Sequence, residues 1–198
     1  LYRESLGWSD LSLDLLSELS EGDDPEIAGP AQFHKGRTRE AAGDSQLAIR
    51  EYREYLERFA GQPQAKEAET KIRYLSTFAP TASVDHELID ILGNTEDRGK
   101  QLELGRLLYT RRYFDEALKH LEAAANDTTH PGTAEASFLL AETLFAIDLR
   151  DQMLGQSSQR HGSQISSLLT KLTGNTNAFS DDAALRLIDI QHESGPDT

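Results

Sequence analysis

The sequence predicts an all-α protein, and three features of its 198 residues support this fold class. It contains 28 leucines but one valine, Val84, whereas strands favour β-branched residues and helices favour leucine. Leucines recur at helical spacing, as at Leu104 and Leu108, which places them on one helix face. Glycine and proline interrupt the chain often, for example at Pro131 and Gly132. The pieces between these breaks have the usual length of a globular helix, about 12 to 16 residues, and predict a series of short antiparallel helices.

Composition excludes several classes of function. The chain has 34 acidic and 20 basic side chains, a net charge of −14, which argues against binding to nucleic acid or to anionic lipid. It has no cysteine, which excludes disulfides, thiolate-bound metals and a thiol nucleophile. No apolar run approaches the roughly 20 residues of a membrane span, so we expect no membrane insertion within this chain.

The negative charge is not uniform along the chain. Residues 36–80 carry eight basic and seven acidic side chains, and residues 98–125 carry six basic and four acidic ones. The excess acid lies in residues 1–35, 81–97 and 126–198. The two nearly balanced segments are therefore the first places in which to look for a binding site.

An internal repeat runs through most of the sequence. The matched segments are 36–55 with 105–124, at an offset of 69 residues, and 7–13 with 43–49 and 105–118 with 141–154, each at an offset of 36. These offsets predict a unit of about 34 to 36 residues, made of a helix, a tight turn and a second helix. Because only residues 1–6 precede Gly7, we expect the first repeat to be truncated and the chain to begin inside it.

Small and large residues alternate as close helix packing requires. We expect small residues where the two helices of a hairpin cross, and bulky residues between neighbouring units. The small positions are Gly36, Ala48, Gly105 and Ala117, and the bulky ones are Tyr52, Tyr55, Tyr109 and Phe145.

These positions give the chain a family resemblance. It resembles the tetratricopeptide repeat family through Gly36, Gly43, Ala48, Tyr52 and Pro63, and again through Gly105, Tyr109, Ala117, Leu121, Ala124 and Pro131. The resemblance implies an α-solenoid of stacked antiparallel hairpins, wound into a superhelix, that binds other proteins. Ala60 departs from the pattern, because the family usually has proline there.

Residues 33–68 look most like the repeats of bacterial cell-envelope proteins, namely outer-membrane assembly lipoproteins and the periplasmic Tol–Pal coordinator. That likeness implies the periplasm or the periphery of the outer membrane, rather than the cytoplasm, as the location.

We predict four regions along the chain. Residues 1–80 form repeats, 81–97 an acidic linker or degenerate repeat, 98–155 further repeats, and 156–198 capping helices and a tail. Within the last region we predict helices over 165–172 and 182–192, and a disordered tail over 194–198.

No sequence pattern indicates catalysis. The six histidines show no metal-binding spacing, and residues 93–100 lack the spacing of a phosphate-binding loop. We therefore expect no catalytic residues, no metal and no cofactor, and classify the chain as non-enzymatic.

The candidate site comes from the resemblance. In tetratricopeptide arrays the first helix of each repeat lines a concave groove that holds a partner peptide or helix. The groove residues implied here are Phe33, Arg37 and Glu40 in one repeat and Leu102, Arg106 and Tyr109 in another. The two arginines occupy the same repeat position and could bind carboxylates of a partner. Alternatively, each pairs with a neighbouring glutamate, such as Glu40 or Glu103.

The sequence leaves the following functional hypotheses. The first is a non-catalytic scaffold that binds a partner protein in this groove, in a bacterial envelope assembly. The second is a regulatory or substrate-recruiting region of a larger enzyme whose catalytic domain lies outside this chain. A third, an all-α enzyme, lacks the expected cluster of titratable residues.

Overall fold

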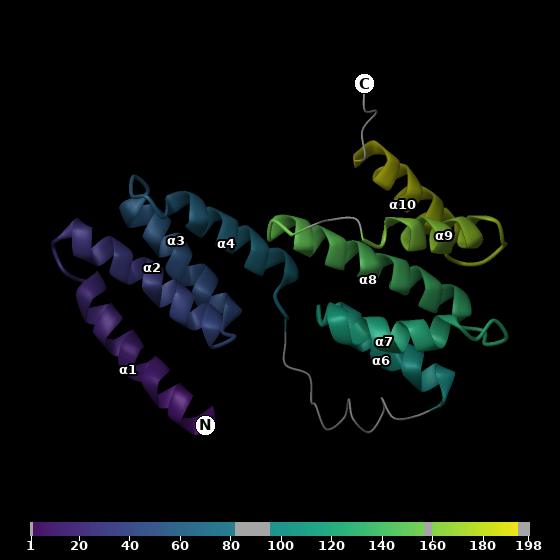
Figure 1. The fold of residues 1–198 in the computed structure, drawn as a ribbon, viewed down its shortest axis with the longest axis horizontal. Coiled ribbons are helices and arrows are strands. Elements are labelled where there is room, and N and C mark those ends of the chain that lie inside the picture. Colours follow the sequence, from purple (N-terminus) through teal and green to yellow (C-terminus); the bar gives the residue numbers. More distant parts are fainter. Residues whose placement is uncertain (1, 82–95, 157–159, 194–198) are drawn as a thin grey trace. The chain divides into compact units, whose positions relative to one another are not determined.

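The computed structural model of the chain describes residues 2–81, 96–156 and 160–193, and the surroundings of side chains from residue 11 to residue 190 within these ranges. In this described part the fold is entirely helical, as predicted (Figure 1). The helices are α1 Tyr2–Ser20, α2 Pro25–Ala41, α3 Ser45–Phe59, α4 Ala65–Phe78, α6 Arg98–Thr110, α7 Phe114–Ala125, α8 Thr133–Met153, α9 Gly162–Thr173 and α10 Ser180–Glu193.

The chain divides into two compact units, Leu1–Ala79 and Pro80–Thr198. Within each unit, helices that follow one another in sequence pack against one another. Nearly all of the predicted linker, from residue 82 to residue 95, lies outside the described residues.

The core of the first unit is aromatic. Phe33 of α2 packs against Tyr52 and Tyr55 of α3, with ring centroids 5.4 and 5.5 Å apart. Ala48 and Ala68 are fully buried beside these rings, which lets α3 lie close to both α2 and α4. Tyr52 and Tyr55 are fully buried, and both contact Phe33 of their own hairpin. That they fill the space between neighbouring units stays a prediction.

The core of the second unit is aliphatic. It joins α6 to α10 through buried leucines and alanines, among them Leu108, Leu121, Leu144 and Leu169. The unit therefore has one continuous core.

The hairpins α2–α3 and α6–α7 turn in the same way. Gly43 in the first turn has φ 82°, and Arg112, which lies 69 residues later, has φ 65°. In each turn the next amide donates back across the end of the first helix, from Asp44 to the carbonyl of Arg39 and from Tyr113 to the carbonyl of Leu108, both at 2.9 Å. The predicted offset of 69 residues thus relates two hairpins with the same local geometry.

In both hairpins, the first helix has a glycine at the point where it crosses the second helix. A Cβ built on Gly36 would lie 2.5 Å from the Tyr52 ring, and one built on Gly105 would lie 2.7 Å from Leu121. Since van der Waals contact begins near 3.5 Å, neither position has room for a side chain. Glycine therefore sets the close approach of the two helices.

Two details of the repeat prediction are corrected. Helix α1 runs from Tyr2 to Ser20 without a turn at Gly7, because one glycine costs a helix only about 1 kcal/mol and its neighbours favour helix. Helix α8 continues to Met153, so the predicted match of Met153 with Ala117 fails, because Ala117 lies in the second helix of its hairpin. The residue with positive φ that follows α8 is Gly155, at φ 72°, so this helix extends further than α6, which is followed by Arg112 at φ 65°.

The two helices predicted near the C-terminus are confirmed as α9 and α10, which pack against each other. Their role as a cap remains a prediction. The predicted tail, 194–198, lies outside the described residues.

Candidate functional site

Three of the six predicted groove residues lie on α2, and they have different surroundings. Phe33 is 2% exposed and belongs to the aromatic core, so it offers no surface to a partner in this structure. The Glu40 carboxylate is already paired within the unit, since it accepts a hydrogen bond from the Tyr52 hydroxyl and forms an ion pair with the Lys71 ammonium, each at 2.8 Å. Arg37 is exposed to solvent. Within this trio, therefore, Arg37 is the residue whose side chain a partner could reach.

The other three lie on α6 and repeat this arrangement. Leu102 is 6% exposed and belongs to the aliphatic core. Arg106 is exposed and pairs with Glu135 of α8 at 3.5 Å, rather than with Glu103 as the sequence allowed. Tyr109 is half-buried, and burial, followed by the charge of Glu142, raises the pKa of its hydroxyl.

The structure therefore places Arg37 and Arg106 at the same position of two similar hairpins, one in each unit. The residue one turn earlier, Phe33 or Leu102, belongs to the core in both hairpins. The residue about one turn later, Glu40 or Tyr109, is partly buried in both. The arginine is the surface position of this helix face in each hairpin.

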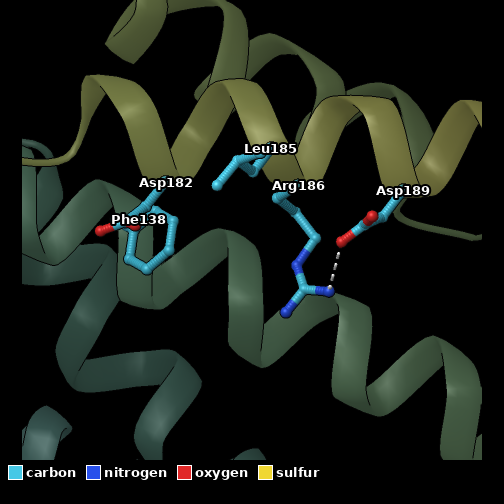
Figure 2. Close-up of a pocket in the computed structure, with 5 residues that line it drawn as sticks. All are labelled: Phe138, Asp182, Leu185, Arg186 and Asp189. Carbon is cyan, nitrogen blue, oxygen red and sulfur yellow. Dashed lines mark ion pairs between the residues drawn. The ribbon is translucent and has the colours of Figure 1, made fainter.

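A small pocket lies between α8 and α10 and is lined by Phe138, Asp182, Leu185, Arg186 and Asp189 (Figure 2). It holds about 200 Å³, which is below the roughly 300 Å³ at which small-molecule sites begin.

The arginine of this pocket is already neutralised. Its Nε and Nη2 donate to both oxygens of Glu142 at 2.5 Å, and its Nη1 lies 3.7 Å from Asp189. The hydrogen bond with Glu142 raises the pKa of Arg186. The bidentate pair joins α8 to α10, and we interpret the pocket as a by-product of that contact.

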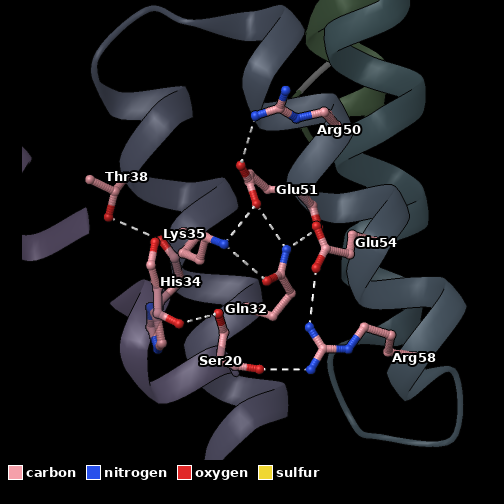
Figure 3. A network of polar contacts seen from close by, with 10 residues as sticks. Ser20, Gln32, His34, Lys35, Thr38, Arg50, Glu51, Glu54 and Arg58 are labelled. Atoms are coloured by element: carbon pink, nitrogen blue, oxygen red, sulfur yellow. Dashed lines mark hydrogen bonds and ion pairs between the residues drawn. The ribbon is translucent and has the colours of Figure 1, made fainter. Parts of the chain in front are cut away.

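A polar network that sequence reasoning missed lies inside the first hairpin (Figure 3). The Gln32 amide donates to the backbone carbonyl of Glu51 at 3.1 Å and to its carboxylate at 2.9 Å. Lys35 and Arg50 approach the same carboxylate at 3.3 and 3.5 Å. Burial alone would raise the pKa of Glu51, but the hydrogen bond from Gln32 and the charge of Lys35 outweigh it and lower that pKa.

The second hairpin has a polar pair at the same two positions. Gln101 and His120 are both buried, and Oε1 of Gln101 lies 2.7 Å from Nδ1 of His120. Burial, with the nearby charge of Lys119, lowers the pKa of His120. The signal in the sequence was the repeated separation of 19 residues, from Gln32 to Glu51 and from Gln101 to His120.

Hydrogen bonds and ion pairs of charged side chains also connect α8 to the residues at the start of α9. Asp148 accepts from the amide and the ring Nδ1 of His161, at 3.1 and 2.7 Å, and Asp151 accepts from Arg160 at 2.5 Å. Since these pairs satisfy two buried carboxylates at a helix junction, we interpret them as structural.

Among the described residues, no group of three or more histidine, aspartate or glutamate side chains is arranged to hold a metal ion. In the same part of the chain, every helix is too short or too polar to cross a membrane.

No protein-family model matches the chain, and no curated protein matches its sequence.

Proposed function

We propose that this chain is a non-catalytic, tetratricopeptide-like scaffold that binds another protein through the first helices of its hairpins. One observation carries this proposal: α2–α3 and α6–α7 share a turn, a glycine crossing and a buried polar pair, and each exposes an arginine at the same position. Repeated hairpins that stack in sequence order form extended surfaces, which such proteins use for binding.

The chemistry of the partner follows from the arginines. A guanidinium group donates two parallel hydrogen bonds to a carboxylate, so Arg37 and Arg106 favour a peptide or helix that carries acidic groups. The pair between Arg106 and Glu135 lies at the surface and contributes no more than about 1 kcal/mol, so a partner carboxylate can replace Glu135. We propose that α2 in the first unit and α6 in the second each present this arginine-bearing face to an acidic segment of the partner.

The test is affinity capture of proteins from cells that produce this chain, with the double variant Arg37→Glu, Arg106→Glu. We expect the partners retained by the unaltered protein to bind at least about tenfold less, while helicity and melting temperature stay the same.

The matched control is Arg53→Glu with Lys171→Glu. Both residues are exposed, and the control makes the same change in charge, on α3 and α9 instead of α2 and α6. Equal loss of partners in the two double variants, or no loss in either, would show the proposal to be wrong.

A further inference from the structure

The outward face of α1 carries a stripe of exposed leucines. Leu11, Leu15 and Leu19 are 69%, 58% and 40% exposed, and their spacing of four residues puts them in one row along the helix. The opposite side of the same helix is packed, since Leu13 and Ser20 are buried. This helix therefore has one apolar row inside the unit and a second one in solvent.

Acidic side chains lie along one edge of this stripe and beyond its C-terminal end. Asp14 and Glu18 are exposed on the same side of α1, and the loop after the helix adds exposed Glu21, Asp23 and Asp24. The sequence from residue 4 to residue 34 contains eight acidic residues and no lysine or arginine. The face is thus apolar along the leucine row and negative along one edge and at one end.

This combination points to an occupant of opposite charge. An amphipathic helix that packs on another helix supplies apolar residues three or four positions apart, and charge complementarity at the border selects it. From Leu11 to Leu19 the stripe extends about 12 Å, which corresponds to two turns of a docked helix.

On a second copy of this chain, neither the apolar face of α10 nor another α1 matches the stripe well. The exposed apolar residues of α10, Leu185 and Ile188, have exposed aspartates beside them, namely Asp181, Asp182 and Asp189. Contact of the stripe with this face, or with another α1, would bring carboxylates together, and like charges at an interface oppose binding. An anionic lipid surface is disfavoured for the same reason.

We infer that the outward face of α1, formed by Leu11, Leu15 and Leu19 with Asp14 and Glu18, is a docking surface for a basic amphipathic helix of a partner protein. The inference rests on the proposed scaffold function, but it concerns a surface and a partner charge different from those of Arg37 and Arg106.

The test uses a fluorescent synthetic peptide of about 18 residues, five helical turns, with leucines four positions apart and lysines on both sides of them. We expect saturable binding to the full chain, measured by fluorescence anisotropy. Exchange of the lysines for glutamates should abolish the binding. Two double variants, Leu11→Gln with Leu15→Gln and Asp14→Lys with Glu18→Lys, should each bind the peptide at least about tenfold more weakly than the unaltered chain does.

The matched control is Leu185→Gln with Ile188→Gln, which changes two similarly exposed apolar residues that also lie beside acidic groups. This control should bind the peptide as the unaltered chain does. Circular dichroism and melting establish that all variants are folded, which their exposed positions favour.

Equal weakening by the control would show that the peptide binds exposed apolar residues beside acidic groups wherever they lie, and would overturn the inference. Binding that Leu11→Gln, Leu15→Gln leaves unchanged but Asp14→Lys, Glu18→Lys abolishes would show attraction to charge alone, and would overturn it too. A dimer in sedimentation velocity that disappears in Leu11→Gln, Leu15→Gln would overturn it in favour of self-association. The two proposals can fail separately. If the peptide does not bind but the variant Arg37→Glu, Arg106→Glu loses its partners, only the proposed α1 surface is wrong. If the peptide binds as expected but that variant keeps its partners, only the proposed arginine surface is wrong.

Discussion

The hairpins α2–α3 and α6–α7 solve the same packing problem with different side chains. In the first, Tyr52 lies over Gly36, and in the second, Leu121 lies over Gly105. The buried partner of the glutamine is a carboxylate, Glu51, in the first hairpin and an imidazole, His120, in the second. The difference shows that the repeat keeps the interior filled and its polar groups hydrogen-bonded at each position, while the chemical group that does so varies.

From this comparison we expect Gly36 and Gly105 to differ in their sensitivity to substitution. Tyr52 is a flat ring, fully buried, packed on Phe33 and tied to Glu40 through its hydroxyl, so it has nowhere to move. Leu121 is also fully buried, but an aliphatic side chain can change rotamer. Substitutions at equivalent positions of the two hairpins can therefore separate rigid from adjustable packing.

The largest effect is expected from a methyl group at the helix crossing. Gly36→Ala should destabilise the first unit by about 2 kcal/mol, because the new Cβ overlaps the fixed Tyr52 ring. Gly105→Ala should cost the second unit about 1 kcal/mol, because the Leu121 side chain can change rotamer and its backbone nitrogen, 3.3 Å from the new Cβ, needs to move only slightly. Hydrogen exchange with mass spectrometry, read separately on α2–α3 and α6–α7, measures each cost.

Gly162→Ala is the control for this pair, since a Cβ there meets no atom within 4 Å. This variant should leave hydrogen exchange in α2–α3 and in α6–α7 unchanged. Equal costs at Gly36 and Gly105 would contradict the distinction between the rigid ring and the adjustable leucine.

The next effect is a difference in pH dependence. Folding lowers the pKa of His120 from its ordinary value of 6.5, so as the pH falls below 6.5 the unfolded chain takes up the proton first and the second unit loses stability. The loss amounts to at most about 1.4 kcal/mol per pH unit. Folding also lowers the pKa of Glu51, from 4.5, so the first unit loses stability from this group only at lower pH.

Urea unfolding, monitored in each unit by hydrogen exchange, between about pH 7.5 and about pH 5.5, checks that the second unit loses stability before the first. The variant His120→Gln keeps a hydrogen-bonding partner for Gln101 and should remove the loss in the second unit over this range. A loss that persists in that variant would assign the pH dependence to another group.

The smallest effect is expected at the turns. Gly43 has φ 82°, and a Cβ added there would meet no atom within 4 Å, so Gly43→Ala tests backbone strain alone and should cost about 1 kcal/mol. Arg112 already accepts this conformation in the second hairpin, which indicates that the strain is tolerable. Thermal unfolding measures the change, with Gly61→Ala as the control because Gly61 is open and lacks a positive φ. A melting temperature that falls equally in both variants would show that φ is not the cause.

Much of the fold could be predicted because it depends on local chemistry. The ratio of leucine to valine and the helical spacing predicted an all-α chain, and the offset of 69 residues predicted two similar hairpins. The small positions Gly36 and Gly105 could be found in one sequence, but the residues that they contact, Tyr52 and Leu121, each 16 residues later, were not paired with them.

The candidate site was predicted less well. Phe33 and Leu102 were placed in a groove, but their side chains complete the cores, and Glu40 is engaged by Tyr52 and Lys71. No local pattern indicated this, because the direction of a residue on a helix depends on the rotation of that helix about its own axis. Packing of the neighbouring helices sets this rotation.

By itself, therefore, the sequence determined the all-helical class, the two C-terminal helices and the repeated small positions, since backbone propensity and short-range spacing control these features. The tertiary structure alone decided which polar groups are buried together, how far α8 extends, and that Leu11, Leu15 and Leu19 face solvent. These properties depend on contacts between helices distant in sequence, and on whether another helix covers a given face, which short-range spacing does not encode.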